Sequence, residues 1–248
     1  MAKLKDKVAI VTGASKGIGA EIARHFAREG ASVVVNYSSS KSAADTVVKE
    51  IEKTGARALA VKADISKSSD IELLFKETQN AFGRLDILVN NAGVYRAGPI
   101  ESVTAEIYHR HFDLNVLGLL LCTKESLKYF GEDGGSIINI SSVASTAAPA
   151  NLSVYSATKA AVDAITRSLS KELGPRKIRV NAINPGLIET EGVHEAGFPD
   201  GFREWIQSET PLGRIGLPDD VSPTAVFLAS SDSKWITGEH WTITGGFR

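Results

Sequence analysis

The chain has 248 residues, of which 43% are apolar and 23% are charged, a composition typical of a soluble globular protein. Its formal net charge of -1 argues against nucleic acid or an anionic membrane surface as a partner. No apolar stretch reaches the roughly 18 residues of a membrane span, and the first apolar run, at 8–11, is too short for the core of a signal peptide. The single cysteine, Cys122, lies in an apolar run and can form no internal disulfide, so we expect a buried thiol in a cytoplasmic protein.

Short apolar runs alternate with amphipathic stretches along the whole chain. The runs are typical of strands buried on both faces, and the amphipathic stretches have apolar residues at helical spacing. This alternation predicts a doubly wound parallel sheet with helices on both faces, formed by one α/β domain over residues 1–248. The expected strands are 8–11, 32–36, 58–61, 87–89, 136–140, 178–183 and 241–244, and the expected helices are one ending at 28, then 42–53, 68–82, 104–130, 154–173 and 218–229.

A glycine-rich loop at residues 12–19, Thr-Gly-Ala-Ser-Lys-Gly-Ile-Gly, joins the first strand to the first helix. Gly13 permits a tight turn, Gly17 lets the backbone approach a ligand, and Gly19 allows the helix to pack closely on the strand. The helix that follows begins with unpaired N–H groups and the positive end of its dipole, and both favour phosphate. At this place between strand and helix, the loop predicts a site for a dinucleotide pyrophosphate.

Small or polar residues follow the other strands. Asp64, after the third strand, could accept a hydrogen bond from an adenine amino group or could merely cap a turn. Ala92 and Gly93, after the fourth strand, leave room for a flat ring against the backbone. Ser142 ends the fifth strand, and a Pro-Gly pair ends the sixth. Because parallel strands end at one edge of their sheet, these residues should lie together where such sheets bind ligands.

Tyr155 and Lys159 are four residues apart in a stretch with helical spacing, so their side chains should share one face of a helix. A free tyrosine has a pKa of about 10 and is a poor acid or base at neutral pH. An ammonium about 5 Å away, at an effective dielectric constant of about 20, favours the phenolate by roughly 3 kcal/mol. Such a phenol could donate a proton to a carbonyl oxygen or remove one from an alcohol. Taken alone, the pair could also be two neighbouring surface side chains.

In this order, the segments TGASKGIG, NNAG, Ser142, YSATK and the Pro-Gly pair resemble the short-chain dehydrogenase/reductase family over essentially the whole chain. The resemblance implies a single-domain Rossmann fold with a seven-stranded sheet, and reversible hydride transfer between a nicotinamide dinucleotide and a ketone or secondary alcohol. It also implies a catalytic tetrad of Asn115, Ser142, Tyr155 and Lys159, with Asn115 holding a proton-relaying water and Lys159 also binding the nicotinamide ribose. The cofactor-binding residues we expect are Gly13, Ser15, Lys16, Gly17, Ile18, Gly19, Asn36, Ser38, Asp64, Ile65, Asn91, Ala92, Gly93, Tyr155, Lys159, Pro185, Gly186, Ile188 and Thr190.

Cofactor preference in such a fold depends on the end of the second strand. A site that prefers NAD has a carboxylate there, which binds the ribose 2′-hydroxyl. In this chain the position is Asn36, and the five residues after it, Tyr-Ser-Ser-Ser-Lys, include no acid. Lys16, assisted by Ser38, could bind a 2′-phosphate, although Lys16 could also be a solvated side chain. We therefore expect NADP(H), with NAD(H) as the alternative.

Within the family, the chain resembles 3-oxoacyl-acyl-carrier-protein reductases and related carbonyl reductases, with glucose-type sugar dehydrogenases as an alternative. Members that bind an acyl carrier protein tend to have basic residues before the fifth strand. This chain has the acidic turn Gly-Glu-Asp-Gly-Gly at 131–135, although Arg176 keeps a second basic position. A catalytically silent dinucleotide sensor is the alternative from another class, but a sensor has no need of Tyr155 with Lys159.

The least regular segment, at about 189–211, follows the sixth strand at the ligand-binding edge, and we expect it to form a substrate lid. Its aromatic residues Phe198, Phe202 and Trp205 would either cover an apolar ketone or pack on the sheet. The five histidines suggest no metal site, because even His109 and His111, two residues apart, would not share a helix face.

The helix expected at 104–130 is longer than the average of about 11–12 residues and has apolar residues all round. A helix that covers a sheet needs only one apolar stripe, so a second apolar face predicts burial by a partner. The helix at 154–173 carries small residues that permit close approach. The family resemblance implies a homotetramer, and we expect these two helices to form its main interface.

Overall fold

The structure, a computed structural model, describes residues 2–195 and 201–247. Strands and helices alternate along it as the sequence predicts. The strands are β1 (Val8–Val11), β2 (Ser32–Tyr37), β3 (Ala58–Lys62), β4 (Ile87–Asn90), β5 (Gly135–Ile140), β6 (Ile178–Pro185) and β7 (His240–Ile243). The helices are α1 (Gly17–Arg28), α2 (Lys41–Glu52), α3 (Ser68–Phe82), α4 (Ala105–Phe112), α5 (Leu119–Ser126), α6 (Ala144–Ala147), α7 (Ser153–Leu173), α8 (Glu191–Glu195), α9 (Phe202–Glu209) and α10 (Pro218–Ala229), with a π-helix, η2 (Asp113–Gly118), between α4 and α5 and single 3₁₀ turns at Ile100–Ser102, Gly174–Arg176 and Ser231–Ser233.

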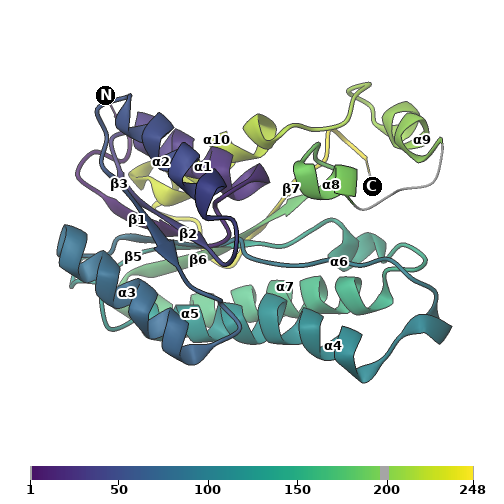
Figure 1. Ribbon diagram of the computed structural model, residues 1–248, viewed down its shortest axis with the longest axis horizontal. Coiled ribbons are helices and arrows are strands. Elements are labelled where there is room, and N and C mark those ends of the chain that lie inside the picture. The colour runs from purple at the N-terminus through teal and green to yellow at the C-terminus, as the bar shows by residue number, and fades with distance from the viewer. Residues whose placement is uncertain (1, 196–200, 248) are drawn as a thin grey trace.

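The strands of the described residues form one parallel, seven-stranded sheet in the order β3-β2-β1-β4-β5-β6-β7. This confirms the predicted doubly wound α/β architecture. The strand order reverses between β1 and β4, and sheets of this kind bind ligands beside such a reversal, at the carboxyl ends of the strands. The loops that follow β1, β4, β5 and β6 therefore meet at one edge, where α6, α8 and α9 also lie (Figure 1).

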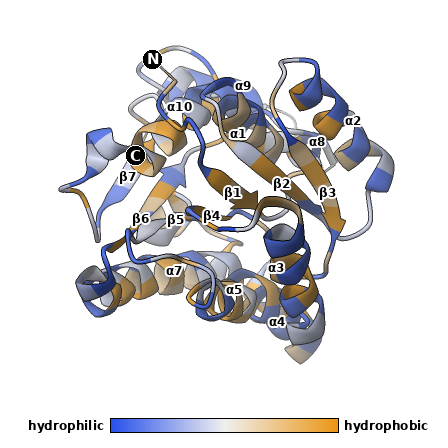
Figure 2. Cartoon of the chain, turned by 90° about the vertical axis from the view of Figure 1, so that its left-hand side faces the viewer, coloured by the Kyte–Doolittle hydropathy of each residue, from blue (hydrophilic) through white to orange (hydrophobic). Residues whose placement is uncertain are grey.

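Two hydrophobic cores hold the layers together. Helices α1, α2 and α10 cover one face of the sheet, and α3, α5 and α7 cover the other (Figure 1). In Figure 2 strands β1 and β2 carry mostly the hydrophobic colour, as expected for strands covered on both faces. In β2, Val33 and Val35 face the first core and Val34 faces the second, which is the alternation of a strand. In the part of the chain described here, no helix is both long and apolar enough to cross a membrane.

The helix expected at 104–130 differs from the prediction in one respect. It is continuous in direction, but the six residues of η2 have π-helical turns, and the regular helix ends at Ser126. Position 118 in this part of the helix needs a glycine, because a Cβ there would lie 2.7 Å from the carbonyl oxygen of Ile65. π-Helical turns are frequent at functional sites, and this one contains Asn115.

Candidate active site

The glycine loop forms a cradle that excludes side chains. Gly13 and Gly17 have φ angles of +62° and +59°, which favour glycine. A Cβ at Gly19 would lie 2.4 Å from Nδ2 of Asn91 and 2.8 Å from the Gly13 carbonyl oxygen. The first turn of α1 has no acidic residue, and Lys16 at its N-cap makes no side-chain capping hydrogen bond. The loop and helix N-terminus therefore fit the pyrophosphate of a dinucleotide.

Thr12 and Asn91 join this loop to the segment after β4. The Thr12 hydroxyl accepts hydrogen bonds from the N–H groups of Asn91 and Ala92, at 2.9 and 3.0 Å. The Asn91 amide donates to the carbonyl oxygens of Thr12 and Gly13, at 2.8 and 3.1 Å. Asn91 and Ala92 are among the cofactor residues predicted from the sequence. Thr12 is not, although a hydroxyl at the end of a buried strand was a signal that could have identified it.

Asn115 fixes the next residues of that segment. Its Nδ2 donates to the Val94 carbonyl oxygen at 2.9 Å and to the Thr158 hydroxyl at 3.1 Å, and its Oδ1 accepts from the Val94 N–H at 2.8 Å. A Cβ at Gly93 would lie 3.1 Å from Asn115 Oδ1 and 3.8 Å from Lys159 Nζ. Gly93 therefore lies between two of the four predicted catalytic side chains.

Ser142 and Tyr155 bring two hydroxyl groups together. Ser142 follows β5, and its hydroxyl accepts a hydrogen bond from the Ala144 N–H at 3.1 Å. Burial raises the pKa of Tyr155, while hydrogen bonding to Ser142 acts in the opposite direction. We expected a nearby ammonium to lower this pKa, and that expectation is wrong for the chain alone. The Coulomb argument left out the cost of burying a phenolate, and here that cost is larger.

Lys159 lies one helical turn after Tyr155 and is buried. Its Nζ donates to the Ile140 carbonyl oxygen at 2.8 Å and lies 5.7 Å from the centroid of the Tyr155 ring. Burial lowers the pKa of Lys159 to about 8, and the negative charge of Asp163 partly opposes this effect. The lysine is therefore held beneath the phenol by the end of β5, on the same face of α7 as predicted.

Asn36, predicted to contact the cofactor at the end of β2, does not present its side chain to a ribose site. Asn36 is only 1% exposed, and its side chain bonds to the backbone of the glycine loop and of the end of β3. Ser38 and Lys16 are exposed at the surface. Asp64 accepts hydrogen bonds from the N–H and hydroxyl of Ser66, both of which contribute to a lowered pKa for its carboxyl group. Asp64 thus caps a turn, one of its two predicted alternatives, and part of its side chain stays accessible.

The segment after β6 lies against the fifth strand and the glycine loop. The Pro185 carbonyl accepts from the Val143 N–H at 2.9 Å, and a Cβ at Gly186 would lie 3.2 Å from Thr244. The side chain of Thr190 lies close to Gly17, where a Cβ would be 3.3 Å from its methyl group. The remaining predicted cofactor residues are Ser15 and Ile18, which are partly buried, and Ile65 and Ile188, which are buried.

The expected lid contains α8 and α9, while Phe198 lies outside the described residues. Phe202 and Trp205 pack on each other with ring centroids 5.9 Å apart, and Trp205 packs edge-on against Phe247 at the same distance. Their described contacts are thus with each other and with the C-terminal segment. Tyr95, an aromatic residue that was not identified from the sequence, contacts both the Tyr155 ring and α8.

Tyr95 makes one contact to α8 and one to Tyr155. Its hydroxyl donates to the Gly192 carbonyl oxygen of α8 at 2.5 Å, and its ring lies 6.0 Å from the Tyr155 ring at an interplanar angle of 61°. Its position two residues after Gly93, at the ligand-binding edge, was a signal that could have identified it.

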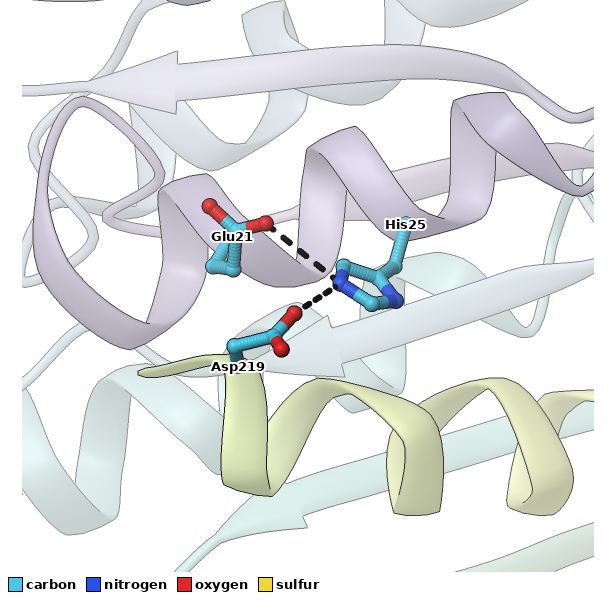
Figure 3. A group of neighbouring side chains, drawn as sticks. All are labelled: Glu21, His25 and Asp219. Carbon is cyan, nitrogen blue, oxygen red and sulfur yellow. Dashed lines mark hydrogen bonds and ion pairs between the residues drawn. The ribbon is translucent and has the colours of Figure 1, made fainter. Parts of the chain in front are cut away.

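A histidine and two carboxylates gather away from this site, on α1 and α10 (Figure 3). His25 Nε2 lies 2.6 Å from Asp219 Oδ1 and 3.4 Å from Glu21 Oε1. Arg24 and Arg28 pair with the same glutamate, at 3.0 and 3.5 Å. Because these guanidinium groups neutralise Glu21 and Asp219 is largely exposed, we interpret the cluster as an ion-pair network between two helices. Sequence spacing could not predict it, since His25 and Asp219 are 194 residues apart.

Cys122 is fully buried in the second core, and burial raises its pKa to about 12. The thiol is therefore protonated at neutral pH and is a packing residue, as the apolar run around it predicts.

Comparison with known proteins gives consistent matches over the full length. The model of a family described as Enoyl-(Acyl carrier protein) reductase matches residues 13–248. An uncharacterized oxidoreductase of Methylorubrum extorquens is 53% identical over 249 residues, and the match covers 100% of both chains. The hydroxynaphthalene reductase-like protein Arp2 of Metarhizium brunneum is 41% identical, with 98% of this chain and 95% of that protein covered. Among solved structures, the angucycline C-6 ketoreductase LanV with bound NADP has a TM-score of 0.93 and 35% identity, covering 99% of this chain and 97% of that one.

Proposed function

The chain belongs to the short-chain dehydrogenase/reductase family of oxidoreductases, and we propose that it is an NADP(H)-dependent ketoreductase for ketones with flat, fused rings. The observation that carries this function is the placement of the Tyr155 phenol beside the buried Lys159, whose Nζ lies 5.7 Å from the centroid of the phenol ring, with Ser142 at the end of the neighbouring strand β5. Two hydroxyls and an ammonium at the carboxyl edge of the sheet are the groups needed to bind a carbonyl oxygen and deliver a proton to it.

The protein's part in the reaction follows from these positions. A nicotinamide dinucleotide held by the glycine loop at residues 13–19 would supply the hydride that reduces the ketone. The ketone oxygen accepts hydrogen bonds from Ser142 and Tyr155, and Tyr155 gives up its proton as negative charge develops on that oxygen. Lys159, as an ammonium, stabilises the phenolate that remains. Asn115 holds Val94 and the start of α7 in place, which keeps the tetrad in register. Oxidation of an alcohol uses the same groups in reverse.

The cofactor assignment is supported by the groups around the cradle. The backbone of residues 13–19 leaves room for phosphate, and neither the first turn of α1 nor the exposed residues 38–40 after β2 contribute a carboxylate that would repel a 2′-phosphate. Lys16 and Ser38 are the exposed side chains that would bind that phosphate. A solved relative with bound NADP is consistent with this choice.

The substrate class is inferred from the aromatic wall next to Tyr155. Tyr95 sets its ring at an angle to the catalytic phenol and ties it to α8, which leaves a rigid aromatic surface beside the reacting hydroxyl. Aromatic surfaces of this kind favour flat rings over flexible chains. Two relatives carry names that refer to a hydroxynaphthalene and to an angucycline ketone.

The other candidates are weaker. An acyl-carrier-protein substrate would meet the acidic side chains of Glu132 and Asp133, which repel an acidic carrier. For a silent sensor, the buried Lys159 would be an unexplained cost in stability. A glucose-type sugar substrate would find an aromatic ring, Tyr95, where a polyol needs hydrogen-bonding groups.

A ketone panel tests the proposal. NADPH consumption should be measured with 2-tetralone, a β-ketoacyl thioester and a small aliphatic ketone, and NADP⁺ reduction with glucose. We expect kcat/KM for 2-tetralone to exceed the others by about tenfold or more. Tyr95→Ala should lower the value for 2-tetralone much more than that for the small ketone. Preference for the thioester or for glucose, or turnover of none of them, would contradict the assignment.

A further inference from the structure

A buried carboxylate lies one helical turn beyond the catalytic lysine. Tyr155, Lys159 and Asp163 follow one another at intervals of four residues on α7, so they share one face of that helix. Asp163 is 5% exposed and Lys159 is 6% exposed. Carboxylates are seldom buried to this extent unless they are paired or hydrogen-bonded. In the described part of the chain, Asp163 has no ion pair within 4 Å, and an amide holds its carboxylate.

That amide belongs to Asn184, near the end of β6. Its Nδ2 lies 3.0 and 3.2 Å from the two carboxylate oxygens of Asp163, and 3.1 Å from the Ser145 hydroxyl. It also lies 3.3 Å from the carbonyl oxygen of Ser142. Asn184 is 3% exposed, and its Oδ1 has no partner among the described residues. The opposite orientation would set that oxygen against the carboxylate, so the unpaired acceptor is explained by the contact to Asp163.

Other polar groups on the elements packed against this face of α7 lie close to Lys159 and Asp163. His240 on β7 contacts the backbone carbonyl of Asp163 through Nε2 at 3.0 Å, and Arg167 contacts its other ring nitrogen at 3.3 Å. Lys159 is contacted by the Tyr155 phenol on α7 and the Ile140 carbonyl oxygen on β5, and its Nζ and Asn115 Oδ1 on η2 both lie near Gly93. Asp163 is contacted by the Asn184 amide on β6 and the His240 ring on β7, and the Arg167 guanidinium contacts that ring.

We propose that Asp163 and Asn184 are positioning residues of the active site. Asp163 keeps the buried ammonium of Lys159 charged in the pH range where the enzyme works. Asn184 holds that carboxylate and ties it to the strand end that carries Ser142. The catalytic consequence rests on the proposed ketoreductase function, whereas the electrostatic link between the two side chains does not.

The physical reason is that burial and charge act on Lys159 in opposite directions. Burial alone favours the neutral amine, and a neutral amine does not stabilise a phenolate. The negative charge of Asp163 favours the ammonium, so the pKa of Lys159 falls no further than about 8. Without the charge of Asp163, Lys159 would lose its proton at a lower pH. The upper pH limit of ketone reduction would then move down by the same amount.

The direct test is to measure the titration of Lys159 in wild type and in Asp163→Asn. Asparagine keeps the shape and one acceptor for Asn184 but removes the charge. In protein labelled with ¹³C-lysine, the Cε signal that is absent from Lys159→Met reports Lys159. We expect its titration to move to lower pH by about one unit in Asp163→Asn. Asp86→Asn is the matched control, since Asp86 is also 5% exposed but pairs with Arg84 and Lys7, far from the site, and it should leave the signal unmoved.

The positioning role of Asp163 and Asn184 in catalysis is tested separately, by enzyme kinetics. In ketone reduction, the alkaline limb of the kcat/KM profile should move to lower pH in Asp163→Asn by the same amount as the signal. Asn184→Ala should lower kcat several-fold and leave the Kd for NADPH within about twofold, because it loosens Ser142 without touching the cofactor. An unmoved Lys159 signal in Asp163→Asn would overturn the electrostatic link whatever the activity. A shifted signal with an unchanged pH profile, or an unchanged kcat in Asn184→Ala, would overturn the positioning role. Absence of ketone turnover in wild type would instead count against the proposed function.

Discussion

The backbone N–H of Gly13 donates a hydrogen bond to Oδ1 of Asn36 at 3.0 Å, so the end of β2 holds the first glycine of the cradle. The Nδ2 of the same amide faces the carbonyl oxygens of Val61 and Ala63, at 3.3 and 3.0 Å. Asn36 is therefore a structural link between the loop and β3, and its side chain lies beneath the surface. In the proposed cofactor site, discrimination at the ribose 2′ position would therefore depend on the exposed residues nearby.

Asn36→Asp should consequently destabilise the protein and should not convert it to NAD(H) use. A carboxylate oxygen would replace the donor that faces two carbonyl oxygens, and a buried unpaired charge costs at least about 2 kcal/mol. For a chain of this size, that corresponds to a fall in Tm of roughly 5 °C or more. Thermal unfolding at pH 7 measures it. Ser38→Asp, at an exposed position just after β2, is the control and should leave Tm nearly unchanged. An Asn36→Asp protein that is as stable as wild type and prefers NADH would contradict the structural role of Asn36.

Cofactor choice should depend on Lys16 and Ser38. Loss of the cation in Lys16→Ala, or addition of a charge repelling phosphate in Ser38→Asp, should lower the ratio of kcat/KM for NADPH to that for NADH by about tenfold. Steady-state kinetics with both cofactors gives the ratio. Lys234→Ala, an exposed lysine distant in sequence from the cradle, should not change it. If neither substitution near the cradle moves the ratio, the 2′-phosphate is bound elsewhere.

Tyr155→Phe should abolish turnover and retain NADPH binding. Only the proton donor is lost, and a positioned acid contributes about 10²–10⁴-fold to the rate. Fluorescence titration should give a Kd for NADPH close to that of wild type. Tyr129→Phe is a suitable control, because Tyr129 stacks on Phe75 in the second core and the substitution keeps the ring. More than about a tenth of wild-type kcat remaining in Tyr155→Phe would show that another group donates the proton.

Most of the fold followed from the sequence because it depends on local patterns. Short apolar runs between turn residues indicate the strands, and a core-facing apolar stripe indicates the helices. Some helices also have a glycine at their end, such as Gly83 in the left-handed region after α3. The π-helical turns around Asn115 were not predictable in this way. An apolar helix shows the same pattern with or without an extra residue per turn. The close approach of Gly118 to the Ile65 carbonyl oxygen is likewise a contact between segments distant in sequence.

Tyr155 and Lys159 could be proposed as site residues because their spacing is local, and Ser142 because it follows a strand end, whereas Asn115 was implied only by the family resemblance. Side-chain direction could not be predicted. β2 is buried on both faces, so alternation could not tell whether Asn36 faced solvent or the backbone of β3. Asp163 and Asn184 were missed for a similar reason. Each is a single polar residue in an apolar element, and only the packing of α7 on β6 brings the two together.

Lys159→Met should stabilise the protein while abolishing activity. Burial lowers the pKa of Lys159 from 10.5 to about 8. Below pH 8, the folded chain holds a buried ammonium, which costs about 3 kcal/mol of folding free energy. Between pH 8 and 10.5, Lys159 is protonated in the unfolded chain and neutral in the folded chain. The contribution of this group to the free energy of unfolding therefore rises with pH. We therefore expect the Tm of Lys159→Met to exceed that of wild type by about 5 °C at pH 7 and the difference to shrink toward pH 10. A lower Tm at pH 7 would contradict this account of the lysine.

Apolar side chains are exposed along α4, η2 and α5. Tyr108, Leu117 and Leu120 are 44%, 45% and 36% exposed along α4, η2 and α5, which is the second apolar face expected from the sequence. Beside them on α7, small residues at Ala157, Ala160 and Ala164 are also exposed. Apolar side chains gathered on neighbouring helices predict burial against a second copy, with small residues allowing the helices to approach closely.

Light scattering of wild type should therefore give a mass that is a multiple of 26.4 kDa. The double substitution Leu117→Glu with Leu120→Glu should yield smaller species, because it places charges in the predicted interface. Activity should fall with dissociation, since η2 also carries Asn115. Leu73→Glu is the control: Leu73 is 47% exposed but lies on α3, outside the predicted interface, so the mass should not change. A fully active wild-type monomer would show that this face has another use, and dissociation by Leu73→Glu would place the interface on α3 instead.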